Sequence, residues 1–367
     1  MLAEYRARYE KELFESVIPF WMKHSLDRQY GGQFTCLDRD GSVYDPRKYV
    51  WMQGRAVWMF SKLYNTVERK QEWLDAATLI LDFVRKFGKD SQGRYHFSLT
   101  RDGQPAASQR KPYAAVFVML GLLEYSKTGA GEEYKQEAIE LFGQIRQWIA
   151  DPTLLGRPKQ DIQQLADVMV TLSMALELGD GPVIAECIPA ALRHYVPSRS
   201  LLVENIASRQ YPEGRLTCPG HVAEVCWFLL HALDQQPDPA TEKMVLEILE
   251  GALQFGWDRE YGGLYYFMDI DRKPAVPLEA NMKLWWPMTE AIYAVILAYK
   301  RTNESKWLEW LSRLDHYAFA HFADRQYGEW YGYCDRQGNP ANQAKGGAYK
   351  GFFHVPRFLL NSIQALK

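Results

Sequence analysis

Two short segments of the sequence place a histidine where it could transfer protons. His221 follows Cys-Pro-Gly at the expected start of a helix, and Glu224 lies three residues later, where its carboxylate can orient the imidazole. His354 lies in an aromatic segment, just before Val-Pro. Histidine titrates near neutral pH, so one histidine can remove a proton while another donates one. The alternative for His221 alone is a histidine that only caps its helix.

Two further segments add cations and aromatic rings. Trp51 and Arg55 stand at positions i and i+4, so they share one face of a helix. Because burying an unpaired guanidinium is costly, Arg55 is expected to line a cavity rather than a core. The other segment joins Lys283, the pair Trp285–Trp286 and Glu290. Two tryptophans alone are also typical of a core.

The motifs of several other enzyme classes are missing. The sequence contains no Walker A loop, since Gly346–Gly351 has the wrong spacing and no Lys-Ser/Thr ending, and it has no G-x-S-x-G or strand-linked G-x-G-x-x-G segment. His316 and His321 are five positions apart, which puts them on different faces of a helix. We therefore expect no metal and no redox cofactor.

The composition is that of a folded protein with a large core. Hydrophobic residues make up 47% and charged residues 24% of the 367 residues. The net charge of -2 gives no broad basic surface, so neither nucleic acid nor an anionic membrane is an expected partner. The 12 Trp and 22 Tyr residues fit a large core, and a sugar-binding cavity is the functional alternative, because aromatic faces stack on sugar rings.

The ends and the cysteines indicate the compartment. Residues 1–15 are charged and helix-like, and no apolar stretch is long enough to span a bilayer. The five cysteines are scattered and form no C-x-x-C pair, as expected of free thiols in a reducing compartment. The sequence therefore predicts a cytoplasmic protein without a signal peptide or a membrane span.

A segment with the pattern Asp-x-x-Tyr-Gly recurs along the chain. It begins at Asp27, Asp258 and Asp324, and in each copy a second aspartate follows eleven residues after the first. A weaker copy begins at Asp90. The glycines permit tight turns and the following aromatic residues favour a short strand, so each copy is expected to form a β-hairpin or a structured loop.

The spacing of these copies predicts the architecture. The stretches between them have helical periodicity. Asp27 and Asp90 are 63 positions apart and Asp258 and Asp324 are 66 apart, which is room for two helices and a hairpin, and the gap in between leaves room for two degenerate units. Six helix pairs predict an all-α fold, a closed (α/α)6 barrel of about twelve helices with short β-hairpins on one rim. No flexible linker interrupts residues 1–367, so we expect a single catalytic domain.

Six segments of the sequence resemble the N-acylglucosamine 2-epimerase family, whose mammalian members are also called renin-binding proteins. They keep the family's order and extend over nearly the whole chain. The segments are FWMKHS (20–25), YVWMQGRAVWM (49–59), PGHVAEVCWFLL (219–230), MKLWWPMTEA (282–291), YGEWYGY (327–333) and KGGAYKGFFHVPR (345–357). The resemblance implies an (α/α)6 barrel, in agreement with the repeat spacing.

The resemblance also implies roles for individual residues. It makes His221 and His354 the catalytic pair, with Arg55 and Glu290 essential beside them, and we add Glu224 to the expected catalytic set as the partner of His221. The expected sugar-binding residues are Trp51, Tyr113, Lys283 and Trp286.

One departure distinguishes this sequence from other sugar enzymes that resemble it. Related sugar isomerases and cellobiose 2-epimerases also use a histidine in the middle of the chain. This sequence has no histidine between His96 and His194, and the expected helix near Asp167–Ala175 lacks one. That difference favours the N-acyl branch.

The resemblance implies the reversible interconversion of N-acetyl-D-glucosamine and N-acetyl-D-mannosamine, a sialic acid precursor. A base removes the proton on C2 of the open-chain sugar, the charge spreads onto O1 as an enediolate, and an acid returns a proton to the opposite face. No cofactor is required for this chemistry. The resemblance further implies ATP as an allosteric activator and a homodimer as the assembly.

Three alternatives stay open at this point. An aldose–ketose isomerase or another sugar 2-epimerase would use the same enediolate. A glycoside hydrolase on the same barrel would need two carboxylates across the scissile bond, and Glu224 and Glu290 are the candidates. A non-catalytic partner-binding protein is the third reading, because the mammalian family members bind renin.

Overall fold

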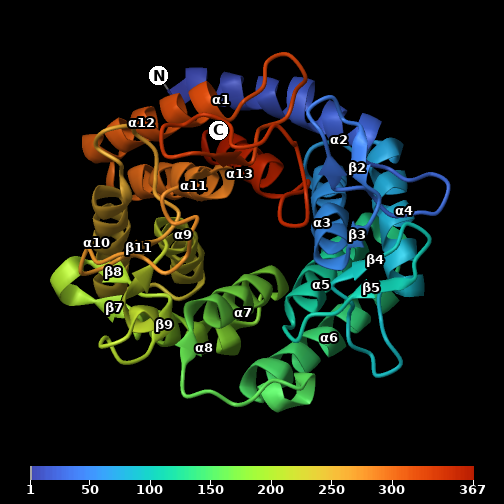
Figure 1. Cartoon of the computed structure of the whole chain (residues 1–367), viewed down its shortest axis with the longest axis horizontal. Helices are drawn as coiled ribbons and strands as arrows, with labels where there is room; N and C mark the ends of the chain where they lie inside the picture. The colour runs from blue at the N-terminus through green and yellow to red at the C-terminus, as the bar shows by residue number, and fades with distance from the viewer. Residues whose placement is uncertain (1) are drawn as a thin grey trace.

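Helices of an inner and an outer layer alternate along the chain and close into a ring (Figure 1). The structure, a computed structural model, describes residues 2–367. The inner helices are α3 (Val50–Thr66), α5 (Tyr113–Tyr125), α7 (Leu165–Leu178), α9 (Pro219–Gln235), α11 (Trp285–Thr302) and α13 (His354–Ala365). The outer helices are α4 (Gln71–Phe87), α6 (Glu132–Ala150), α8 (Gly181–Leu192), α10 (Pro239–Gly256) and α12 (Ser305–His321), with α1 (Leu2–Lys11) and α2 (Ile18–His24).

The prediction of about twelve helices is confirmed. α1 and α2 are joined without a break by the π-helical turn η1 (Glu12–Val17), so residues 2–367 contain twelve long helical segments. α1 packs against α13, and the two ends of the chain lie side by side on one arc of the ring (Figure 1). None of the helices described in this range is long and apolar enough to cross a membrane.

Burial distinguishes the two layers. Outer helix α4 buries Trp73, Ala77, Ile80 and Val84 on one face and carries its charged residues on the other. Inner helix α5 is instead buried nearly all round. A large share of the aromatic residues therefore serves to fill the space between the layers, as the composition suggested.

Two glycines bring neighbouring inner helices into backbone contact. A Cβ atom at Gly54 in α3 would overlap the backbone of Phe117 in α5. A Cβ atom at Gly121 would lie 2.8 Å from the carbonyl oxygen of Gly54. The close approach of α3 and α5 therefore depends on both glycines, and it fixes the relative positions of the side chains that these helices direct inward.

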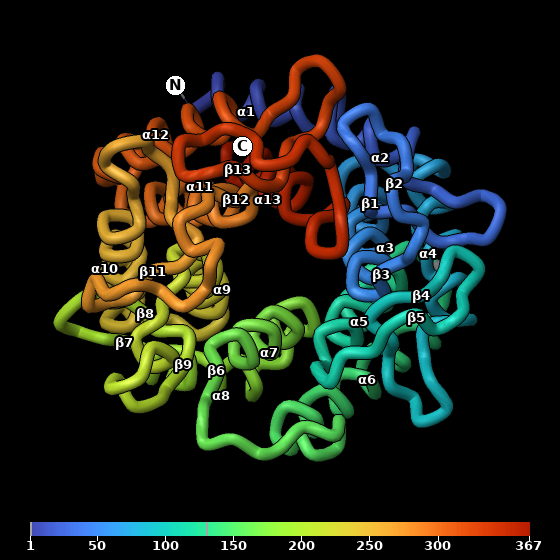
Figure 2. Tube along the Cα trace, viewed as in Figure 1, coloured from blue at the N-terminus to red at the C-terminus, as the bar shows by residue number. Residues whose placement is uncertain are grey.

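Short strands lie in the loops at one rim of the ring (Figure 2). Strands β3, β6, β10 and β12 immediately precede the inner helices α3, α7, α9 and α11. Because each of these strands stands at the N-terminal end of an inner helix, they share one rim. The pairs are β1 (Cys36–Leu37) with β2 (Val43–Asp45), β3 (Lys48–Tyr49) with β4 (Ser98–Leu99) and β5 (Pro105–Ala107), β6 (Gln163–Gln164) with β9 (Asn205–Ile206), β7 (Tyr195–Val196) with β8 (Leu201–Leu202), β10 (Leu216–Thr217) with β11 (Met268–Asp269), and β12 (Lys283–Leu284) with β13 (Tyr333–Cys334).

The first aspartate of each full repeat forms the same ion-pair cluster, which we call the rim clasp. Each of these aspartates is buried and binds a fully buried lysine and an arginine from the turn of the next hairpin. The arginine therefore ties one repeat to its neighbour. The clasps are Asp27 with Lys48 and Arg101 (3.0 and 2.9 Å), Asp258 with Lys283 and Arg336 (both 3.0 Å), and Asp324 with Lys345 and Arg39 (2.9 and 2.8 Å).

The third rim clasp closes the ring. Arg39 belongs to the first hairpin of the chain and Asp324 to the last. This last copy also differs in its turn, where Glu329 replaces the second glycine and adopts a positive φ of 55°. Glu329 tolerates this unfavourable conformation because it is buried and bound by Lys350 Nζ at 2.7 Å.

Candidate active site

A cavity of about 870 Å³ opens where the inner helices begin. Trp51, Tyr113, Trp285 and His354 stand at the first or second residue of their helices, and His221 stands at the third residue of α9. The rim strands thus bring side chains that are far apart in sequence to one end of the ring. Of the sequence-predicted residues, the cavity is lined by Trp51, Arg55, Tyr113, His221, Glu224, Trp286 and His354.

His354 is held by a carboxylate from α11. Its Nδ1 atom lies 2.7 Å from Oε1 of Glu290, and this carboxylate also accepts hydrogen bonds from Trp227 Nε1 at 2.8 Å and Arg357 Nη2 at 2.8 Å. A carboxylate with three donors keeps the proton of His354 on Nδ1, which leaves Nε2 as the basic nitrogen. Glu290 lies behind His354 and does not line the cavity itself.

His354 is a neutral base in this setting. Burial lowers the pKa of His354 well below its ordinary value, and the charges of Arg55 and Arg357 act in the same direction against the opposing charge of Glu224. At neutral pH the imidazole therefore carries no charge and can accept a proton.

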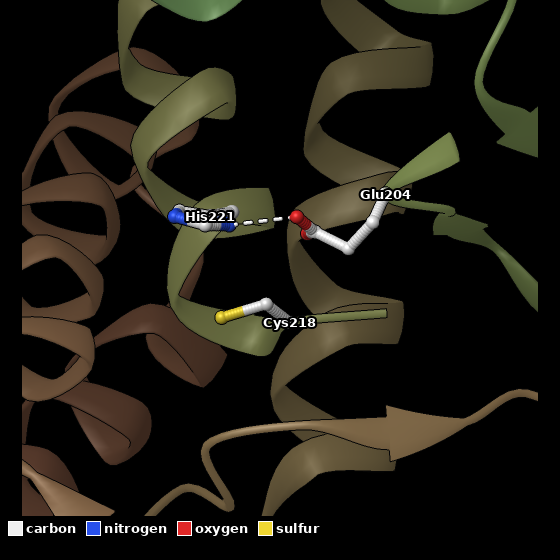
Figure 3. Close-up of side chains that lie close together, drawn as sticks. All are labelled: Glu204, Cys218 and His221. Carbon is white, nitrogen blue, oxygen red and sulfur yellow. Dashed lines mark hydrogen bonds and ion pairs between the residues drawn. The ribbon is translucent and has the colours of Figure 1, made fainter. Parts of the chain in front are cut away.

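His221 is held by Glu204, which the sequence analysis missed. Nδ1 of His221 lies 3.0 Å from Oε2 of Glu204, and Figure 3 shows the other ring nitrogen pointing away from this carboxylate. Glu204 lies in the loop between β8 and β9, and no local pattern in the sequence predicts its contact with His221. The prediction that Glu224 orients His221 is wrong, because Glu224 binds Arg357 Nη2 at 2.6 Å instead.

His221 has the opposite protonation state from His354. Burial alone would lower the pKa of His221, but the charge of Glu204, together with Cys218, raises this pKa well above its ordinary value. At neutral pH His221 is therefore an imidazolium that can donate a proton. The structure thus brings one protonated and one neutral histidine to the same cavity.

Trp286 lies against both catalytic candidates. Its ring centroid is 4.8 Å from that of His221 and 5.8 Å from that of His354. The indole is nearly buried but lines the cavity. A sugar ring or open-chain sugar lying against this indole would have the imidazoles of both His221 and His354 nearby.

Arg55 faces the cavity without a carboxylate. Its guanidinium carbon lies 3.9 Å from the ring centroid of Phe117 and 4.6 Å from that of Trp51. Nε is buried without a hydrogen-bond partner, and no ion pair links Arg55 to any residue in the described range 2–367. Burial and then the charge of Arg357 lower the pKa of Arg55 to about 9, so the group stays charged at neutral pH. A cation left unpaired in a cavity is a candidate anion-binding group.

Arg357 is a second residue that the sequence analysis missed. It binds both Glu224 and Glu290, at 2.6 and 2.8 Å, and its side chain is almost fully buried. A signal was available, because Arg357 stands within an apolar helix segment, the same argument that singled out Arg55. Arg357 thus neutralises the two carboxylates that stand beside the candidate base His354.

The expected sugar contacts divide into two groups. Trp51 Nε1 donates to the carbonyl of Ala348 at 2.9 Å, and the Tyr113 hydroxyl lies 3.2 Å from Asp167, so both rings are fixed at the cavity wall. Lys283 does not reach the cavity. Its ammonium is fully buried in the rim clasp with Asp258, and this placement corrects the expected sugar contact.

Comparison with known proteins identifies the family. Residues 32–165 and 198–357 match the sequence profile described as N-acylglucosamine 2-epimerase (GlcNAc 2-epimerase). The chain is 38% identical to the N-acylglucosamine 2-epimerase of Mus musculus, in an alignment covering 100% of this chain and 92% of the mouse protein. The chain belongs to the N-acylglucosamine 2-epimerase family.

Solved structures confirm the fold of this epimerase. The cellobiose 2-epimerase of Bacillus thermoamylovorans B4167 superposes with a TM-score of 0.83 at 21% identity and covers 99% of both chains. A D-mannose isomerase superposes with a TM-score of 0.83 at 18% identity, over 98% of this chain and 97% of that one. At this level of identity the likeness concerns the fold alone, and the predicted (α/α)6 barrel is confirmed.

Proposed function

We propose that this epimerase interconverts N-acetyl-D-glucosamine and N-acetyl-D-mannosamine by proton transfer at C2. The observation that carries the proposal is the pair of histidines in opposite protonation states, His221 and His354, packed against Trp286 in one cavity. Inversion at a carbon needs a base on one face and an acid on the other, and this pair supplies both. The mouse relative is named for the same class of reaction.

The proton balance follows from the two resting states. Nε2 of neutral His354 takes the proton from C2 of the open-chain sugar, and the electron pair of the C2–H bond moves toward C1, so that negative charge develops on O1. Imidazolium His221 then donates its proton to the opposite face of C2, and the electron pair returns from O1. One proton leaves and one arrives, while His354 becomes charged and His221 neutral.

Arg55 is the proposed partner of the charge on O1. A guanidinium without a carboxylate partner in a buried wall offers donors that need no rearrangement when the enediolate forms. Glu290 and Glu204 fix the tautomers of the two imidazoles, and Glu224 neutralises Arg357 beside them. These roles rest on position and charge.

The arrangement weighs against a glycoside hydrolase. Glu290 is held by His354, Arg357 and Trp227 and does not line the cavity, while Glu224 is bound to Arg357. Neither carboxylate is free to act across a glycosidic bond in the way that reaction needs. An aldose–ketose isomerase would use the same two histidines, so the product must separate these two reactions.

The test is incubation of the purified protein with N-acetylmannosamine, followed by identification of the sugar formed. N-acetylglucosamine is the expected product. Conversion of mannose to fructose without turnover of N-acetylmannosamine would contradict the proposal in favour of an isomerase.

Regulation, assembly and location are part of the same proposal. We infer that ATP activates the enzyme without being consumed, which a comparison of rates with and without ATP tests.

We also propose a homodimer, to be measured by light scattering. The cytoplasm is the proposed location, and five buried free cysteines support a reducing compartment. Retention of an N-terminally tagged copy in a membrane or secreted fraction would contradict that location.

A further inference from the structure

Two clusters of side chains in the described part of the chain have the composition of a metal site. In one of them, Glu224 and Glu290 surround His354, but Arg357 Nη2 already lies 2.6 and 2.8 Å from the two carboxylates. The guanidinium fills the place that a cation would take. This first cluster is therefore complete without a metal.

In the second cluster, no arginine or lysine of residues 2–367 forms an ion pair with the carboxylate. This cluster consists of Glu204, Cys218 and His221, and one ligand atom from each side chain lies within 4.8 Å of the other two. Figure 3 shows the carboxylate and the imidazole facing each other, with the thiol beside the imidazole at the start of α9. Within residues 2–367, His221 is the only ion-pair partner of Glu204. Oε1 of Glu204 is buried without any hydrogen-bond partner, an arrangement that is costly unless a ligand satisfies it.

We propose that Glu204, Cys218 and His221 form a binding site for a thiophilic divalent cation such as Zn²⁺. Thiolate, imidazole and carboxylate are the three ligand types that Zn²⁺ prefers, at about 2.0–2.3 Å from the metal. Tetrahedral ligands at these lengths stand roughly 3.3–3.8 Å apart, so a pair of ligand atoms at the upper limit of 4.8 Å must approach by about 1.0–1.5 Å. Glu204 and His221 line the cavity, so the fourth position is open to water.

A metal ion bound at this site is expected to inhibit the epimerase activity. Binding displaces the proton of the Cys218 thiol and one proton of the His221 imidazolium, and Glu204 exchanges its hydrogen bond to His221 for the metal, so two protons are released per cation. The proton displaced from His221 is the one on Nδ1, which faces Glu204. The hydrogen left on Nε2 then belongs to a neutral, metal-bound imidazole, which is a much weaker acid than the imidazolium, so proton delivery to C2 is slowed. The site itself stands on the geometry of three side chains, whereas the inhibition rests on the proposed function.

Cobalt provides a direct readout of the site, independent of activity. Co²⁺ is titrated into tag-free, chelator-treated full-length protein while the near-ultraviolet thiolate-to-cobalt charge-transfer band is recorded. The band is expected in the wild type and absent in Cys218→Ala. The matched control is Cys226→Ala, which removes a fully buried thiol within α9 that belongs to neither cluster found among residues 2–367, and this variant should keep the band. Absence of the band in the wild type, or its persistence in Cys218→Ala, would overturn the site.

Inhibition by Zn²⁺ forms the second arm, with each variant compared with its own rate without metal. The wild type and Cys226→Ala should be inhibited alike. Cys218→Ala should need at least about tenfold more Zn²⁺ for half inhibition, because losing a metal ligand lowers the metal affinity at least as much as losing a residue that only hydrogen-bonds a ligand. Equal inhibition of all three proteins would overturn the inhibitory role. An enzyme without activity on N-acetylhexosamines would defeat the proposed function alone, since the cobalt band would still report the site.

Discussion

Nδ1 of His221 lies 3.0 Å from Oε2 of Glu204, a residue that stands 17 positions earlier in the chain. The carboxylate stabilises the imidazolium, so in the proposed mechanism His221 begins the reaction as the acid. His354 is the proposed base, because burial and the charges of Arg55 and Arg357 disfavour its charged form. A single cavity thereby holds the two groups that a C2 inversion requires in the states that it requires.

Replacing Glu204 by glutamine should lower kcat by about 10²-fold, since removing the group that orients and charges a catalytic imidazole has effects of this order. The folded-state pKa of His221 is raised, so the acid form is lost only as pH rises through that value. Without the carboxylate this pKa falls, and the alkaline limb of the kcat/KM profile should move to lower pH. Glu224→Gln is the matched control, because Glu224 binds Arg357, and its alkaline limb should stay in place. A shift in Glu224→Gln alone would reverse the assignment.

Arg55 should be tested by two substitutions that separate charge from shape. Arg55→Met removes a charge that lowers the pKa of His354, so the base should protonate at higher pH and the acidic limb of kcat/KM should move upward. Arg55→Lys keeps the charge and should leave that limb near its wild-type position. It should still lower kcat by about tenfold or more, because an ammonium cannot reproduce the fork of donors. Full activity in Arg55→Lys with unchanged KM would remove Arg55 from the site.

The ring-closing rim clasp predicts a stability defect. Asp324→Asn leaves the fully buried ammonium of Lys345 without its carboxylate and should lower the free energy of unfolding in urea by about 3 kcal/mol at pH 7. Burial opposes it, but hydrogen bonds from Arg39 and Lys345 hold the pKa of Asp324 well below its ordinary value. The stabilisation that ionised Asp324 gives to the folded state is therefore fully present above the pKa of about 4 that an aspartate has in the unfolded chain, and it is lost as the pH falls below that value. The exposed neighbour Arg325 provides the control, and Arg325→Gln should stay within about 0.5 kcal/mol of the wild type.

The architecture could be predicted because the number of residues between the copies of the repeat indicates how many helices lie between them. The Asp-x-x-Tyr-Gly copies and their spacing led to the helix number, the closed ring and the rim. The same repeat also held a signal that went unused, since Lys48, Lys283 and Lys345 follow their repeat aspartates at similar distances. Those intervals mark Lys283 as a structural lysine rather than a sugar contact.

The active site was only partly predictable, for a physical reason. Residues that share a helix face, such as Trp51 and Arg55, are linked by local geometry. Glu204 meets His221 only because β8 and β9 place their loop against the start of α9, and that contact depends on the packing of the ring. Sequence proximity favoured Glu224, which lies three residues from His221, but Glu224 is bound to Arg357 in the folded protein.

Variants that lack one of the two histidines should each retain only one half of the reaction. His221→Asn and His354→Asn should each lower kcat for epimerisation by about 10²–10⁴-fold while the protein stays folded. In heavy water, His221→Asn retains the neutral base His354 and should exchange the C2 hydrogen of one epimer only. His354→Asn retains a histidine that rests as an imidazolium, so it should exchange the C2 hydrogen of the other epimer only at a pH high enough to deprotonate His221. Proton NMR of each sugar after incubation shows this directly. Exchange of both epimers by either variant would contradict the assignment of one histidine to each face.

Transfer of solvent hydrogen to C2 tests the two-histidine mechanism. Wild-type enzyme is incubated with N-acetylmannosamine in heavy water, and both sugars are analysed early in the reaction by mass spectrometry and NMR. We expect N-acetylglucosamine carrying one deuterium at C2 and none at C1, while the remaining N-acetylmannosamine is largely unlabelled, because the proton taken by one histidine is not the one delivered by the other. N-acetylglucosamine formed without deuterium at C2 would contradict the two-histidine account.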